Sequence, residues 1–172
     1  MRIVATRPDL DLNKAGVQRY MTLLRASSLT DEENAERREF LRYLVQPMAW
    51  VYWAFLRSGA RVGRNSYPSE VFVKRARSYS TNIPLDVWLN SMCREFSVGQ
   101  PPTEVVEVVN TLSHCSGEVL RYIRAAAVVA CGMAITIANE WREESKREHG
   151  KTEDREAVRD VDDAQSGLPF RD

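Results

Sequence analysis

The sequence feature that constrains the fold most is a run of apolar residues with helical spacing between Gly117 and Trp141. Its members lie alternately three and four residues apart and are Leu120, Ile123, Ala127, Ala130, Ala134, Ile137 and Trp141. Because three consecutive members are alanine, a partner helix must come unusually close there to make van der Waals contact. The opposite side is also apolar, at Val128, Val129, Met133 and Ile135. An apolar helix of this kind is enclosed by protein, so we expect residues 117–141 to form the central helix of a bundle.

A second long helix is expected after Thr30. Thr30 and Glu33 form a capping box, and an apolar stripe with helical spacing runs from Phe40 to Leu56. Pro47 lies inside that stripe, where it removes a backbone donor and disfavours helical angles at the preceding residue. We therefore expect a kink or a break at Pro47.

Shorter helices complete the expected bundle. Capping residues followed by apolar residues predict helices that begin after Asp11 or Asn13, near Asn82 and Pro84, and at Thr103. Residues 69–78 fit a short helix or a strand, and their periodicity does not separate the two. The sequence thus predicts an all-α fold of five to seven helices around residues 117–141.

Three regions divide the chain. Residues 1–10 are expected to form an extended arm, residues 11–149 the helical domain, and residues 150–172 a charged tail. The last helix is expected to end near His149 and Gly150, because residues 142–172 carry seven basic and ten acidic side chains and few apolar ones. Both arms are expected to be available to neighbouring molecules.

Composition excludes several classes of protein. The chain of 172 residues carries 24 basic and 24 acidic side chains, which removes any argument from bulk charge for nucleic acid or an anionic membrane. The three cysteines include no C-x-x-C pair, and an odd number argues against a secreted disulfide framework. No signal peptide is visible, and the longest uncharged run, residues 125–139, is too short to span a bilayer. The expected location is the cytoplasm or a particle assembled there, with no membrane partner.

The inventory of catalytic groups is almost empty. His114 and Cys115 are neighbours in sequence, which on a helix point in different directions and do not form a dyad. A set of four glutamates falls partly on one helical face, in the manner of a magnesium site; they are Glu32, Glu33, Glu36 and Glu39. Acidic residues in a first helical turn also serve the helix dipole, which explains two of them without a metal. We expect no catalytic residue, no metal site and no cofactor.

One segment concentrates positive charge. Between residues 57 and 77, six cations oppose a single carboxylate, Glu70, and the six are Arg57, Arg61, Arg64, Lys74, Arg75 and Arg77. Tyr67, Phe72 and Tyr79 lie among or beside them, and cations with aromatic rings are what proteins use to bind single-stranded nucleic acid. Alternatively, these cations pair with acidic residues elsewhere in the chain, above all in the C-terminal tail.

These observations favour a non-enzymatic helical protein that self-assembles and contacts nucleic-acid backbone through the six cations, as a coat or nucleoprotein subunit does. The expected partners are other copies of the chain and single-stranded nucleic acid, RNA in the first place. Two alternatives stay open. One is an adaptor or regulator that binds another protein, and the other, ranked below it, is a magnesium-dependent hydrolase.

Overall fold

The computed structural model describes residues 1–64, 66–77, 83–115 and 117–165, and within these residues it contains seven helices and no strand. They are α1 (Lys14–Arg25), α2 (Asp31–Ser58), α3 (Pro68–Arg77), α4 (Leu85–Glu95), α5 (Thr103–Ser113), α6 (Gly117–Val129) and α7 (Cys131–Gln165). The prediction of an all-α bundle of five to seven helices is confirmed. Residues 69–77, for which the sequence left helix and strand open, are helical. The expected cap Asn82, as well as Ser78 and Tyr79, lie outside the described residues.

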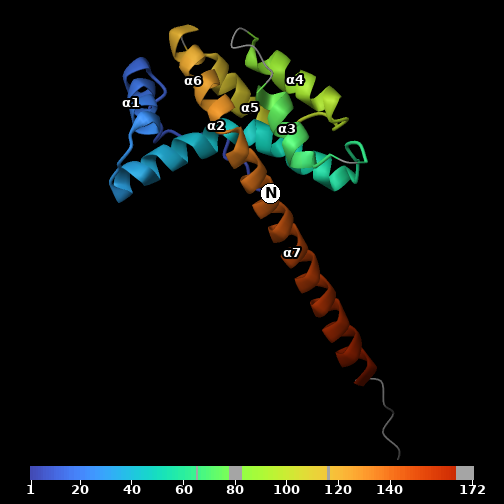
Figure 1. The fold of residues 1–172 in the computed structure, drawn as a ribbon. Coiled ribbons are helices and arrows are strands. Elements are labelled where there is room, and N and C mark those ends of the chain that lie inside the picture. The colour runs from blue at the N-terminus through green and yellow to red at the C-terminus, as the bar shows by residue number, and fades with distance from the viewer. Residues whose placement is uncertain (65, 78–82, 116, 166–172) are drawn as a thin grey trace, which may run out of the picture.

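Helices α1 to α6 and the first part of α7 pack together into what we call the body, and α2 occupies its centre (Figure 1). Helix α2 packs against α1, α4, α5, α6 and α7, most extensively against α7. It begins at the predicted capping box, in which the backbone amide of Glu33 donates to Thr30 Oγ1 and the Thr30 amide donates to Glu33 Oε2. From residue 40 to residue 55, every side chain except Arg42 and Ala54 is buried. A helix buried on all sides is the core element of a bundle. The central position predicted for residues 117–141 is therefore wrong, because α2 holds it.

Pro47 does not break α2. The helix is continuous from Asp31 to Ser58, and its ribbon bends near the middle (Figure 1). A proline deprives the carbonyl four residues earlier of its helical donor, and here that carbonyl belongs to Tyr43. The side-chain amide of Gln46 donates to it at 3.3 Å. The residue before the proline thus satisfies the acceptor that the proline leaves free.

The N-terminal segment, residues 1–10, contains no helix or strand and is docked on α2. The Val4 amide donates to Gln46 Oε1 at 2.7 Å, and Gln46 Nε2 donates back to the Val4 carbonyl at 3.1 Å. The Tyr43 hydroxyl donates to the Ala5 carbonyl, and Arg7 pairs with Glu39 at 2.8 Å. The buried amide of Gln46 therefore acts as a clamp on the arm.

The predicted helix 117–141 is two helices. Helix α6 ends at Val129, α7 begins at Cys131, and the two are bent by 62°. At the break the Met133 amide donates to the Ala130 carbonyl at 2.8 Å, three residues back instead of four, so the backbone tightens there. The prediction that protein encloses this segment on all sides is also wrong, because Val129 is 72% exposed.

The alanine seam itself is buried where α7 meets the body. Ala130, Ala134, Ile137 and Trp141 are all less than 9% exposed, and Ala138 beside them is fully buried. Small side chains at these positions let α7 approach α2 closely, which agrees with the extensive contact between the two helices.

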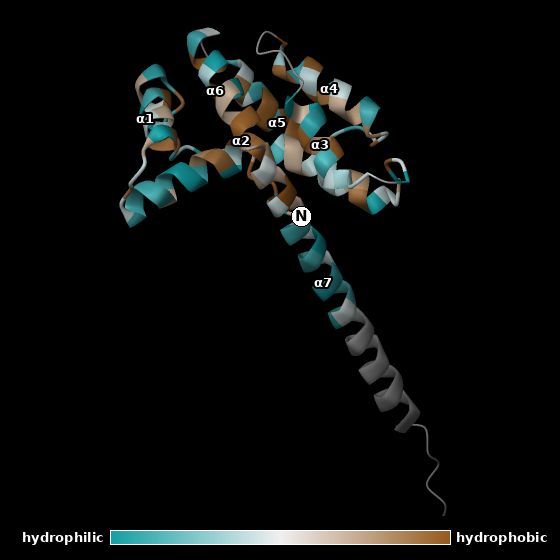
Figure 2. Ribbon diagram, viewed as in Figure 1, coloured by the Kyte–Doolittle hydropathy of each residue, from teal (hydrophilic) through white to brown (hydrophobic). Residues whose placement is uncertain are grey.

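Helix α7 does not end at Gly150 but continues to Gln165. Its 35 residues correspond to a length of about 52 Å at 1.5 Å per residue. After Trp141 the helix projects from the rest of the fold (Figure 1), and its residues up to Lys151 are hydrophilic (Figure 2). From Arg142 to Lys151 every side chain is exposed except the half-buried Ser145. Residues 150–165 are thus a helical extension rather than an irregular tail.

Candidate anion-binding surface

The six cations predicted as a site are all exposed, but the structure does not gather them into one group. Arg57 lies in the last turn of α2, Arg61 and Arg64 lie in the connection to α3, and Lys74, Arg75 and Arg77 lie in the last turns of α3. Arg75 Nε pairs with Glu95 Oε1 of α4 at 2.6 Å. One of the protein's own carboxylates therefore holds Arg75.

Two of the cations border a shallow hollow between α3 and α7. Lys74 and Arg77 lie on one side of it, Ile135 of α7 on the other, and Val73 contributes apolar surface. Glu70 is the one carboxylate that lines this hollow. The hollow thus combines an apolar floor with a mainly cationic rim.

A second hollow lies between the end of α2 and α7. Arg57 here joins cations from α7 that lie far away in the sequence, namely Arg142 and Lys146, together with His149. The Arg57 guanidinium lies over the ring of Trp53, 4.7 Å from its centroid, in a cation–π contact. Trp53 is buried, and its indole nitrogen has no hydrogen-bond partner among the described residues.

Both hollows lie along the same face of α7. Ile135, which lines the first, and Arg142, which lines the second, are seven residues apart, and this spacing returns to the same side of a helix after two turns. Two turns correspond to about 10 Å along the axis. We call the resulting surface the cationic surface. Its charged members are Arg57, Lys74, Arg77, Arg142 and Lys146, and His149 lies beside them.

The charge balance of this surface differs sharply from that of the whole chain. Five arginine and lysine side chains line the two hollows against one carboxylate, whereas the full chain is neutral. The neighbouring Glu143 pairs with Lys146 at 2.9 Å, and this hydrogen-bonded ammonium lowers the pKa of the Glu143 carboxyl. Burial raises the pKa of the Tyr52 hydroxyl, and the nearby Arg142 guanidinium opposes that shift.

Sequence reasoning missed the contribution of α7. Summing charge over residues 142–172 gives an acidic segment and hides the fact that Arg142, Lys146 and His149 follow one another at spacings of four and three. That spacing was the available signal, because it places three basic groups on one helical face. An adjacent face of α7 is acidic instead and carries Glu140, Glu143 and Glu144.

Three of the four glutamates weighed for a metal site have structural partners. Among the described residues, no group of three or more histidine, cysteine or acidic side chains is placed to hold a metal ion. Of the four glutamates, Glu33 closes the capping box, Glu36 pairs with Arg19 and Glu39 pairs with Arg7. Partial burial raises the pKa of the Cys115 thiol, which makes it a poorer nucleophile.

The apolar segment around the α6–α7 break does not form one membrane-spanning helix. No single helix in the described part of the chain is long and apolar enough to cross a bilayer, and α6 and α7 reach the required length and composition only as a bent pair.

Comparisons of this chain with protein-family models, with curated proteins and with solved structures found no match.

Proposed function

We propose that this protein is a non-enzymatic, self-assembling helical protein that binds the backbone of single-stranded nucleic acid, RNA in the first place, on the cationic surface. The observation that carries the proposal is the convergence of cations from α2, α3 and α7 on one face of α7, with one carboxylate among them. A neutral chain that concentrates positive charge in this way presents a local attraction for polyanions.

Binding would consist mainly of phosphate neutralisation. Each phosphate that pairs with an arginine or lysine releases condensed counterions, which favours association at low salt. Arginine offers two parallel donors to a phosphate, and Arg57, Arg77 and Arg142 supply three such forks on this surface. Arg61 and Arg64 are exposed in the connection between α2 and α3 and line neither hollow, so they would contribute to the general attraction for a polyanion rather than to this surface.

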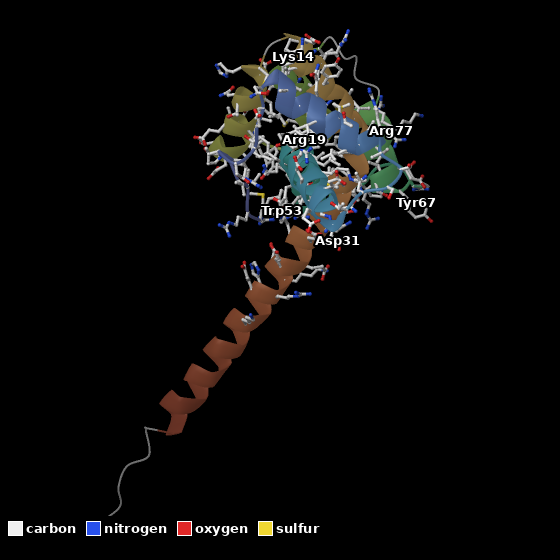
Figure 3. All side chains as sticks on the ribbon, turned by 90° about the vertical axis from the view of Figure 1, so that its left-hand side faces the viewer. Lys14, Arg19, Asp31, Trp53, Tyr67 and Arg77 are labelled. Atoms are coloured by element: carbon white, nitrogen blue, oxygen red, sulfur yellow. The ribbon has the colours of Figure 1, made fainter. Side chains whose placement is uncertain are left out.

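Base stacking would contribute little. Phe72, one of the aromatic residues in the cationic segment, is fully buried, and Trp53 is covered by Arg57. Tyr67 is 70% exposed, and Figure 3 shows it on the same side of the body as Arg77. Among the described aromatic residues of the cationic segment, Tyr67 is thus the accessible ring. One ring suits contact with a nucleic-acid strand but not a base-by-base readout, so we expect weak dependence on sequence.

The test is the affinity for a labelled, unstructured RNA such as oligo(U), measured by fluorescence anisotropy across a range of salt concentrations. For three to five phosphate contacts, the logarithm of the affinity should fall with a slope of about −2 to −3.5 against the logarithm of the salt concentration. Replacing both Arg142→Glu and Lys146→Glu should lower the affinity by about tenfold or more at low salt, because two phosphate contacts become repulsive.

A matched control separates the surface from net charge. Arg147→Glu with Lys151→Glu changes the net charge by the same amount on another face of the same exposed helix. This variant should retain most of the affinity. Equal losses in the two variants, or no binding by the unmodified protein at low salt, would refute the proposed surface.

A further inference from the structure

The two hollows of the cationic surface differ in the charges that line them. The first, between α3 and α7, has two cations and Glu70, together with the apolar side chains of Val73 and Ile135. The second, between the end of α2 and α7, has three cations and His149, and none of the residues that line it is a carboxylate. The second hollow therefore has the greater excess of positive charge, and the two are not equivalent as anion sites.

Two arginines of the second hollow carry charge that the described residues do not neutralise. Arg57 comes from the last turn of α2 and Arg142 from α7, and neither forms an ion pair with a residue that the structure describes. Lys146 differs, because it pairs with Glu143 of the same helix at 2.9 Å. Two guanidinium groups that line one hollow repel each other, and an anion between them would replace that repulsion with attraction.

The second hollow offers donors to a phosphate but no ring to a base. The Arg57 guanidinium lies over the ring of Trp53, 4.7 Å from its centroid. Trp53 is only 8% exposed, so its ring presents little surface on which a base could stack. The other lining residues that carry no charge are Ser145 and Gly150. Recognition in this hollow therefore depends on phosphate rather than on a base.

His149 adds a fourth group to the hollow. Its Nδ1 lies 2.7 Å from the carbonyl oxygen of Ser145. A carbonyl oxygen only accepts, so Nδ1 carries a proton in this contact and Nε2 is the ring nitrogen left for a ligand. The protonated imidazole donates from Nε2, and a nearby anion favours that protonated form.

This set of donors exceeds the needs of a phosphate inside a nucleic-acid strand. An internal phosphodiester carries one negative charge and two oxygens that are free to accept, which a single arginine fork can satisfy. A phosphomonoester carries about −1.5 to −2 charges at pH 7 and offers three acceptor oxygens. Two guanidinium groups, an ammonium group and an imidazole that line one hollow match the monoester better.

We propose that the second hollow binds a terminal phosphomonoester, so that the cationic surface holds the phosphorylated end of an RNA strand there. Arg57 and Arg142 are the main partners of the phosphate, and Lys146 and His149 lie beside them. The first hollow, two turns of α7 or about 10 Å away, would receive internal phosphates of the same strand. This inference rests on the proposed function and adds a preference for strand ends.

The test is a competition assay against labelled oligo(U), with the full-length protein and unlabelled strands that differ only at their ends. One strand carries a 5′-phosphate, one a 3′-phosphate and one only hydroxyl groups. A fourth, hydroxyl-ended and two nucleotides longer, has about the same total charge as the phosphorylated strands. At least one phosphorylated strand should compete about tenfold more strongly than both hydroxyl-ended strands, because its dianion gains charge-assisted hydrogen bonds. Equal competition by the phosphorylated and the longer strand would overturn the inference.

Paired variants place the preference in one hollow. Arg57→Gln with Arg142→Gln should remove the preference for a terminal phosphate, because both forks are lost. Lys74→Gln with Arg77→Gln removes two charges from the first hollow instead, and it should weaken the binding of every strand while the preference remains. Circular dichroism should show equal helix content in all of these proteins. A preference that survives the first pair of substitutions, or is lost equally in both, would contradict the assignment to this hollow.

Uridine monophosphate distinguishes this inference from the proposed function. It should shift the NMR resonances of the Arg142 and His149 side chains in the unmodified protein but not those of His149 in the Arg57→Gln, Arg142→Gln variant. If it does so while no oligo(U) strand binds, the hollow is a site for a free phosphomonoester and the nucleic-acid proposal fails. If hydroxyl-ended strands bind but a terminal phosphate adds nothing and uridine monophosphate causes no shift, the nucleic-acid proposal stands and this inference fails.

Discussion

The two ends of the chain relate to the body in opposite ways. The first thirteen residues contain no helix or strand, yet their backbone is held on α2 by Gln46 and Tyr43. The last described residues form a regular helix, yet from Arg142 onward that helix leaves the body. An extended segment has backbone donors and acceptors that must find partners outside itself, whereas a helix satisfies its own. Docking and regular structure therefore have separate causes in this molecule.

The largest expected effect concerns the point at which α7 leaves the body. Between Cys131 and Lys151, the part of α7 whose side chains the structure describes, Trp141 is the last buried residue and is 5% exposed. Trp141→Ala should lower the free energy of unfolding by about 3–5 kcal/mol, because a large aromatic side chain is lost from the core. Denaturation in urea measures this change.

Glu144→Ala is the matched control for that substitution. Glu144 is exposed one turn further along the same helix, and its removal should change stability by no more than about 0.5 kcal/mol. Similar losses in the two variants would mean that the body supports α7 beyond Trp141, and the boundary drawn here would be misplaced.

The features of the fold that depend on local signals were predictable from the sequence. Thr30 and Glu33 mark the start of α2, and the alanines before Trp141 indicate a closely packed helix interface. The bend at Ala130 was not foreseeable, because the run of apolar residues continues through it and the change to a tighter hydrogen bond depends on packing. The length of α7 departs from the sequence prediction for the opposite reason: a segment with few apolar residues predicts no ordered structure, yet α7 continues as a helix to Gln165.

The candidate site was predicted only in part because it depends on tertiary structure. Exposure of the six cations followed from their charge. The basic excess of residues 57–77 also indicated correctly that the C-terminal end of α2 contributes to the site. The sequence did not show that Arg57 meets Arg142, or that Arg75 meets Glu95, since these pairs come from helices distant in the chain. Gln46 is a similar case, because its partner Val4 lies in a segment without periodicity.

A smaller effect is expected from loosening the N-terminal arm. Gln46→Met keeps the length of the side chain but removes both hydrogen bonds to Val4 and the one to the Tyr43 carbonyl. The expected loss of stability is about 1–3 kcal/mol, because polar backbone groups lose their partners. Hydrogen exchange of an N-terminal peptide should become faster, since the arm is released.

Gln18→Met provides the comparison, because Gln18 is an exposed glutamine on α1 and its replacement should alter neither stability nor exchange. Should Gln46→Met leave the exchange of the N-terminal peptide unchanged, the arm would be held by contacts other than this clamp.

The smallest expected effects are electrostatic, and they compare the two ends directly. In the arm, the Arg7 guanidinium hydrogen-bonds Asp9 and lowers the pKa of that carboxyl to about 2. On α7, Lys146 lowers the pKa of Glu143. A lowered pKa means that each pair stabilises the fold fully above the ordinary pKa of the carboxyl, and that this contribution is lost as the pH falls through the lowered value. Because all four side chains are at least partly exposed, the stabilisation is small.

Carboxyl titrations by NMR can separate the two pairs. Arg7→Gln should raise the pKa of Asp9 toward its ordinary value of 3.8, and because Arg7 also pairs with Glu39 it should loosen the arm as well. Lys146→Gln should raise the pKa of Glu143 toward 4.5 without loosening the core, because the Lys146 side chain is exposed and its ion pair is made with Glu143 of the same helix. We expect Arg7→Gln, but not Lys146→Gln, to release a terminal segment. This difference distinguishes the docked N-terminal arm from the C-terminal half of α7, which is helical without being docked. If Lys146→Gln instead shifted resonances of the α2 core, the outer half of α7 would contact the body more than its exposure indicates.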